Sequence, residues 1–191
     1  MWQQLVVDSL GRPREAARQI LAAGVAGGVL VEAALLVTCV GIVLGYFALT
    51  IAPGGVDMVT AAVLGNPLIG AGIQLAMMAI VIVLTVRIGR LFGGAGDFGG
   101  AAALIIWLNA MLVLIQVAQL IALAVMPPVA ALLAIVTVAW LLWAYANFVA
   151  ELHGFQNPFV VLGATIVTAI MLFLGTGMLI AILGASMRET G

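Results

Sequence analysis

Few residues in this chain of 191 can do acid–base, nucleophilic or metal chemistry: seven are acidic, six are basic, and there is one histidine and one cysteine. Glu151 and His153 are two residues apart, a spacing that places them on different faces of a helix rather than in a ready acid–base pair. No serine, cysteine or aspartate lies beside a base, as an activated nucleophile requires. Cys39 and His153 alone cannot build a metal cluster. We therefore predict a protein that is not an enzyme and has no cofactor or metal.

A second group of polar residues lies inside long apolar stretches of the sequence. Its members are the amides Gln74, Asn109, Gln116, Gln119 and Asn147. Asn109, Gln116 and Gln119 belong to one apolar stretch and fall near one face of its helix. Such amides join helices in membranes at about 0.6 kcal/mol per bond, or they line a polar track for a headgroup, water or ion. No acid or base lies at the middle of any apolar stretch, which argues against a proton pump or coupled transporter.

The composition explains why polar chemistry is so scarce. The chain is 66% hydrophobic and 7% charged, with a mean hydropathy of +1.36, whereas a soluble domain has about 25% charged residues. An apolar run of about 20 residues crosses a bilayer as a helix, because backbone polar groups in lipid must be satisfied within the segment. We predict an all-α integral membrane protein of five transmembrane helices, at about 29–51, 67–86, 101–125, 129–150 and 158–183.

Turn residues separate the runs, and arginines set their orientation. Pro67 and Asn157-Pro158 suit helix starts, Arg87 and Arg90 end the second run, and Gly154 follows the fourth. Five of the six basic residues precede the first run or lie between the second and third, so the positive-inside rule places these segments in the cytoplasm. We expect the bacterial inner membrane, a cytoplasmic N-terminus and a periplasmic tail at 186–191.

The N-terminal arm, residues 1–28, is not a span. Apolar residues recur in it at helical spacing, and Pro13 can open a second short helix with Ala17 and Ile20 on one face and Arg14 and Arg18 on the other. One interpretation is an interfacial amphipathic helix with its arginines near lipid phosphates. The other, which is compatible with it, is a linker helix that caps the bundle. Glu32, early in the first run, is close enough to pair with Arg18 or to stay in water.

Glycines number 23 and fall in two patterns. Gly24 and Gly28, and likewise Gly41 and Gly45, have the small-xxx-small spacing that lets helices approach closely. The loop of residues 93–100 is glycine-rich, but it follows a membrane helix and lacks the lysine of a phosphate loop, so we interpret it as a flexible, tight turn.

Three polar segments together resemble the Yip1 domain family, in particular its short bacterial members. They are residues 13–18 (PREAAR), residues 90–98 (RLFGGAGDF), in which Asp97 stands where the family usually has serine, and residues 151–155 (ELHGF). The resemblance implies five spans with the N-terminus in the cytoplasm. Eukaryotic relatives bind prenylated Rab GTPases, but this chain lacks their long N-terminal region and their Asp-Leu-Tyr-Gly-Pro motif, so we do not expect a Rab partner.

Most hydrophilic features gather in the segments assigned to the cytoplasm. We therefore predict a scaffold or accessory subunit that touches lipid and binds another membrane protein or complex, or a second copy of itself, through Arg87, Arg90, Phe92, Gly93, Gly94, Asp97, Phe98, Glu151, His153 and Gly154. A net charge of −1 and the lack of a basic patch give no sign of nucleic-acid binding. The alternative is a small transporter, channel or lipid-handling protein that uses the amide cluster.

Overall fold

A computed structural model describes residues 2–51 and 66–168, and all regular structure in these two ranges is helical. The elements are α1 (Trp2–Gly11), α2 (Pro13–Ala22), α3 (Gly27–Ile51), α5 (Pro67–Leu91), α6 (Phe98–Val125) and α7 (Pro127–His153), followed by a short apolar helix, Pro158–Thr168. Of these, α3, α5, α6 and α7 are long and apolar enough to cross a membrane. The all-α class is confirmed. The remainder of the fifth predicted span, 169–183, and the tail lie outside the described residues.

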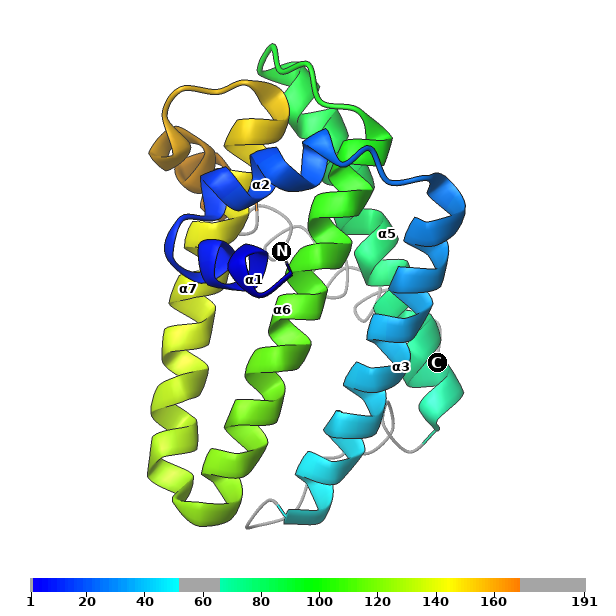
Figure 1. The fold of residues 1–191 in the computed structure, drawn as a ribbon, viewed down its shortest axis with the longest axis vertical. Coiled ribbons are helices and arrows are strands. Elements are labelled where there is room, and N and C mark those ends of the chain that lie inside the picture. Colours follow the sequence, from blue (N-terminus) through cyan, green and yellow to red (C-terminus); the bar gives the residue numbers. More distant parts are fainter. Residues whose placement is uncertain (1, 52–65, 169–191) are drawn as a thin grey trace, which may run out of the picture.

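The four long helices form one bundle with α6 in its middle (Figure 1). Helix α6 packs against α3, α5 and α7. Its buried residues all fall between Ala101 and Met111, where they meet Phe148 of α7, so the tight core lies at the end where α6 begins. Elsewhere the helices expose large apolar side chains, including Leu36, Ile121 and Ile135, as lipid-facing surfaces do.

Polar caps and glycine define the helix ends. Asn66 Oδ1 accepts from Leu68 N at 3.0 Å at the start of α5, and Asp97 Oδ2 accepts from Gly99 N at 3.1 Å at the start of α6. Gly154, at φ 75°, ends α7 in the left-handed region that favours glycine. The end of the second span at about residue 86 stays a prediction, and the helix itself is longer than that span. Helix α5 continues to Leu91, because arginine is a good helix former and its long side chain reaches the polar interface.

The N-terminal arm caps the bundle. Pro13, Ala16, Ala17 and Ile20 of α2 are buried, and α2 packs against α7 and α6, so its apolar face meets protein. This agrees with the second of the two interpretations of the arm. An interfacial position for the arm stays a prediction.

Helix α1 packs against α2 with polar residues buried and apolar residues exposed, the opposite of a helix in a soluble protein. It buries Asp8 and Ser9 and exposes Trp2, Val7 and Leu10. Asp8 is satisfied by Arg12 at 2.9 Å, and Ser9 Oγ accepts from the Trp107 indole of α6 at 2.8 Å. An outward apolar side of this kind suits the edge of a bilayer.

The two glycine pairs differ in whether they lie at a contact between helices. Gly24 lies between helices at φ 56°, and a Cβ at Gly24 or Gly28 would meet no atom within 4 Å, so this pair does not pack helices together within the bundle. A Cβ at Gly41 would lie 3.5 Å from Gln74 Nε2 and 3.7 Å from Val113, whereas Gly45 faces open space. Of these four glycines, Gly41 alone lies at a contact between helices, and its distances are those of ordinary van der Waals contact.

The cap formed by α2 gives a first prediction. Ala17 is fully buried against the core and Ala22 of the same helix is exposed. We expect Ala17→Leu to lower the free energy of unfolding by about 1–3 kcal/mol, because it overpacks a filled site. Denaturant unfolding in micelles measures this, with Ala22→Leu as the matched control. Equal stability of the two variants would contradict the packing of α2 on the bundle.

Candidate functional site

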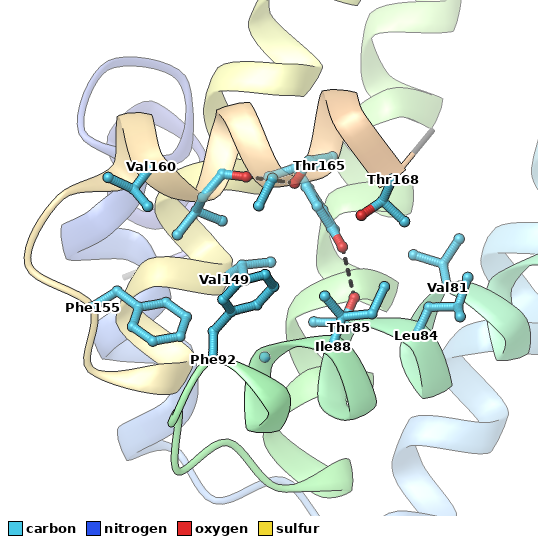
Figure 2. Close-up of a pocket in the computed structure, with 14 residues that line it drawn as sticks. Val81, Leu84, Thr85, Ile88, Phe92, Val149, Phe155, Val160, Thr165 and Thr168 are labelled. Carbon is cyan, nitrogen blue, oxygen red and sulfur yellow. Dashed lines mark hydrogen bonds between the residues drawn. The ribbon is translucent and has the colours of Figure 1, made fainter. Parts of the chain in front are cut away.

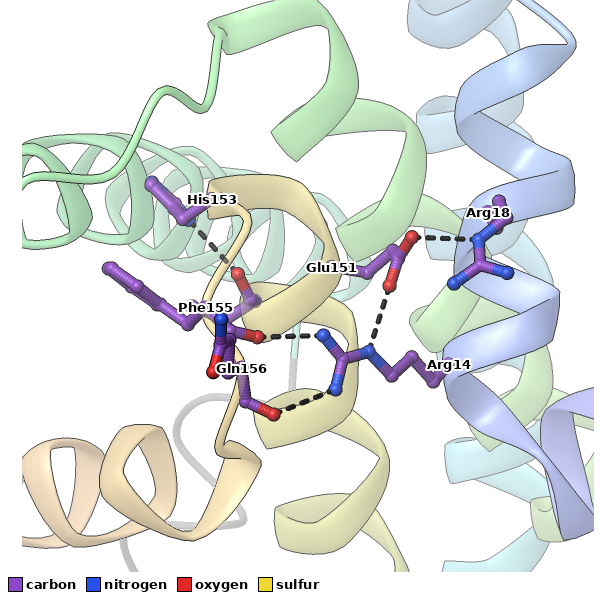
Figure 3. A network of polar contacts seen from close by, with 7 residues as sticks. Arg14, Arg18, Glu151, His153, Phe155 and Gln156 are labelled. Atoms are coloured by element: carbon purple, nitrogen blue, oxygen red, sulfur yellow. Dashed lines mark hydrogen bonds and ion pairs between the residues drawn. The ribbon is translucent and has the colours of Figure 1, made fainter.

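The last turn of α7 is tied to the N-terminal arm by a carboxylate (Figure 3). Glu151 accepts from Arg14 Nε through Oε2 and from Arg18 Nε through Oε1, each at 2.9 Å. The remaining nitrogens of Arg14 donate to the carbonyls of Phe155 at 2.7 Å and Gln156 at 3.0 Å. Charge-assisted bonds to a carboxylate are among the stronger polar contacts in proteins. Arg14 therefore holds α7 and the segment after it with one side chain.

The pairing to Glu151 also raises the pKa of Arg18. Its hydrogen bond to Glu151, and then the charge of that carboxylate, raise the pKa of the Arg18 guanidinium above its ordinary value. The ion pair is therefore fully charged on the arginine side. The possible Arg18–Glu32 pair was wrong: Glu32 is exposed on α3, the second of the two outcomes considered for it.

His153 is enclosed by glycines of a different segment. A Cβ at Gly89 of α5, or at Gly94 or Gly96 of the α5–α6 loop, would overlap the imidazole ring. Nδ1 lies 3.1 Å from the Val149 carbonyl oxygen, which can only accept, so Nδ1 is the donor in this contact. Nε2 is buried and has no hydrogen-bond partner among the described residues. The glycines of the loop thus make room for one ring.

The α5–α6 loop is held at several further points. Arg90 Nε donates to the Gly96 carbonyl at 3.1 Å, and its guanidinium lies 5.9 Å from the centre of the Phe98 ring. Gly94 N donates to the Gly89 carbonyl at 2.9 Å. The sequence interpretation of a tight turn agrees with this geometry, but the glycines are explained by the His153 ring rather than by flexibility.

The predicted partner surface divides into an exposed and an enclosed part. We call the exposed residues the loop face: Arg87, Arg90, Phe92, Gly93, Asp97, Phe98 and Gly154. Gly94 and Glu151 are half-buried and His153 is buried, so these three hold the loop face in place. The sequence-based list missed five residues of the same cluster. Arg14, Arg18 and Phe155 stood in the quoted segments, but nothing marked Gly89 or Gly96 as contacts of a histidine.

The five amides do not converge on one track. Gln119 Nε2 donates to Thr137 Oγ1 of α7 at 3.0 Å, Gln116 Nε2 to the Gly41 carbonyl of α3 at 3.5 Å, and Gln74 lies against Gly41. The other two amides, Asn109 and Asn147, bond to carbonyls of their own helices. This geometry favours amides that join and brace helices over amides that line a path.

Two cavities lie near this end of the bundle. One, of about 420 Å³, is lined by apolar residues of α5, α7 and the Pro158–Thr168 helix (Figure 2). The other, of about 480 Å³, lies between the end of α2, the start of α6 and Leu152. Neither is lined by any of the five amides. In the described parts of the chain, no three His, Cys, Asp or Glu side chains are grouped so as to hold a metal ion.

Comparison with known proteins decides the family. The model of the Yip1 domain matches residues 7–178, which is most of the chain and includes all three polar segments. The chain belongs to the Yip1 domain family. It is therefore a multi-pass membrane protein whose helices contact the lipid bilayer. No curated protein and no solved structure matches it.

In this Yip1 domain the enclosure of His153 can be tested by a double-mutant cycle. We expect Gly89→Ala to lower the free energy of unfolding by about 1–3 kcal/mol through overlap with the ring, and to cost much less in a His153→Ala background. Unfolding by denaturant in micelles measures the coupling. Gly28→Ala, which would face open space, is the control and should be neutral. An equal cost of Gly89→Ala in both backgrounds would refute the enclosure.

The two arginines of α2 should differ in importance. Arg14 makes three bonds and its side chain is 35% exposed, whereas Arg18 makes one and is 68% exposed. We expect Arg14→Ala to lower the free energy of unfolding by about 1–3 kcal/mol and Arg18→Ala to lower it by clearly less. Thermal unfolding of the Yip1 domain in micelles ranks the two. The reverse order would show that the carbonyl bonds of Arg14 contribute nothing.

Proposed function

We propose that this Yip1 domain is a non-enzymatic membrane protein that acts as a scaffold or accessory subunit and binds another membrane protein through its loop face. The observation that carries the proposal is the meeting of three distant segments at one end of the bundle. Residues 14–18, 89–98 and 151–156 hold each other there through Glu151 and His153. A surface built from fixed parts suits recognition, since little conformational freedom is lost on binding.

The reactive side chains are already engaged in structural contacts. Both oxygens of Glu151 accept from arginines, and the ring of His153 is 5% exposed behind its glycines. A general acid or base must reach the proton that it transfers, either directly or through one water. Their engagement supports a role in binding rather than catalysis.

The loop face has the composition of an interaction surface. Next to the exposed Arg87 and Arg90, Leu91 is 84% exposed, Phe92 67% and Phe98 44%. Aromatic residues and arginine are enriched in protein–protein interfaces and at their energetic centres. Arg87 makes no hydrogen bond or ion pair with any described residue, so it is available to a partner.

The charge distribution supports a cytoplasmic position for the loop face. Arg14 and Arg18 bond to the end of α7, and Arg90 bonds within the α5–α6 loop, so these arginines share one end of the bundle. By the positive-inside rule this end faces the cytoplasm, in a bacterial inner membrane with the C-terminus in the periplasm. A polar track along α6 has no support from the two cavities described, so we do not propose the transporter alternative.

Cross-linking in native membranes tests the proposal. A photoreactive residue replaces Leu91 beside the loop face, and a matched one replaces Val125, which is 78% exposed at the other end of α6. We expect one membrane protein, or a second copy of this chain, to be captured from position 91 and not from 125. Arg87→Glu should lower its capture about tenfold, the change that about 1.4 kcal/mol gives.

Capture of the same proteins from both positions, or capture unaffected by Arg87→Glu, would contradict a binding role for the loop face. Each variant is first checked for an unchanged unfolding temperature in micelles. Gln3→Glu, at an exposed position of α1, serves as a charge control away from the loop face.

A further inference from the structure

Helix α1 is attached to α6 at a point well inside the length of that helix. Ser9 Oγ accepts from the Trp107 indole at 2.8 Å, and the ring of Trp2 stacks on the Trp107 ring with their centres 6.3 Å apart. Trp107 is nine residues after Phe98, the first residue of α6, which is about 14 Å along the helix axis. In agreement, α1 is seen part-way along the bundle rather than across its end (Figure 1).

This level of α6 falls within the hydrocarbon core of a bilayer wherever the boundary of the core is drawn. About 20 helical residues cross the core, and α6 has 28, from Phe98 to Val125. The last run of about 20 residues that fits within α6 covers 106–125, so every such run contains Trp107. Because α1 is bonded to Trp107, its outward side lies at a depth where the medium around this multi-pass protein is lipid.

The polarity of α1 fits a helix with lipid on its outer side. Its only charged residue, Asp8, is 4% exposed, and Ser9 is fully buried. Arg12 and two glutamine amides donate to the Asp8 carboxylate at 2.9–3.2 Å, so this charge is compensated within the arm. Polar groups without partners are costly in hydrocarbon, which selects helices that turn such groups toward the protein.

The exposed side of α1 is apolar or uncharged. Its large apolar side chains are Trp2, Val7 and Leu10, of which Val7 is 59% exposed. The exposed polar side chains are two amides of the first turn, Gln3 and Gln4, and Gln4 is bonded to Asp8. This side continues the lipid-facing apolar surface of the long helices.

The arginines of the arm are engaged in ion pairs, so the apolar side is what α1 offers to a membrane. Arg12, at the turn into α2, lies 2.9 Å from Asp8 and 3.1 Å from Glu15, and the other two arginines bond to Glu151. We propose that α1 embeds its outer side among the acyl chains of the bilayer half nearer the start of α6, without a bond to a lipid headgroup. This placement is independent of the loop-face proposal, because α1 contributes no residue to that surface.

Spin-label accessibility of the full-length chain in phospholipid vesicles tests the placement. Cys39→Ala removes the natural thiol, and a nitroxide is attached at Val7→Cys. Oxygen enters hydrocarbon, whereas a polar nickel chelate stays in water. Leu114→Cys, exposed at the middle of α6, is the lipid control. Gln156→Cys, exposed in the loop after α7, is the water control, because non-helical backbone stays out of lipid.

We expect the label at residue 7 to collide with oxygen more than with the chelate, as the label at residue 114 does. The ratio of the two collision rates at residue 7 should exceed that at residue 156 about tenfold, the change that about 1.4 kcal/mol of partitioning gives. Vesicles of phosphatidylcholine alone, and vesicles that also contain phosphatidylglycerol, should give the same ratio, because the contact is apolar.

A second labelled position keeps the test valid if Val7→Cys does not fold. Leu10→Cys, three residues further along the same exposed side, should give the same result. A ratio at residues 7 and 10 close to that at residue 156 would place α1 in water and overturn the proposal. Weak collision with both reagents would show that a protein, or a second copy of this chain, covers α1, and would also overturn it. So would a lipid-like ratio that appears only with phosphatidylglycerol, since headgroup charge would then place the helix.

Discussion

The Glu151 carboxylate is the polar contact on which the arrangement of this Yip1 domain depends. Of the four ion pairs among residues 2–51 and 66–168, two join residues within the arm and two join the arm to Glu151. Its side chain is 16% exposed, and a carboxylate removed from water needs compensating partners. Arg14 and Arg18 supply them, and so α2 is fixed across the end of α7 and covers the core formed by α6 and α7.

The same turn of α7 fixes the other side of the bundle through an uncharged contact. His153, two residues after Glu151, points into the glycines of α5 and the α5–α6 loop, while Arg14 holds the carbonyls of Phe155 and Gln156. One helix end therefore positions the arm, the loop and the start of the Pro158–Thr168 helix. The acidic and imidazole groups serve this structure, and the exposed arginines and aromatic rings of the loop face form the surface for which we propose a binding role.

Much of the fold could be predicted from the sequence, and less of the site. Long apolar runs predict helices because lipid leaves backbone groups no other partner, and Asn66, Asp97 and Gly154 act at helix ends as their residue types indicate. The contact of Arg14 with Glu151 spans 137 positions and has no local signature. The glycine loop could not be read correctly either, because a glycine that makes room for a distant ring looks the same in sequence as one in a flexible turn.

Hydrogen exchange of the full-length chain in lipid nanodiscs, compared between the natural protein and Glu151→Gln, tests the central claim most directly. Loss of the charge weakens the bonds from Arg14 and Arg18 without changing the size of the side chain. We predict faster exchange of amides throughout α2 and at residues 154–156, with the middle of α6 unchanged. Equal protection of α2 in the two proteins would show that Glu151 does not hold the arm on the bundle, and would contradict this account.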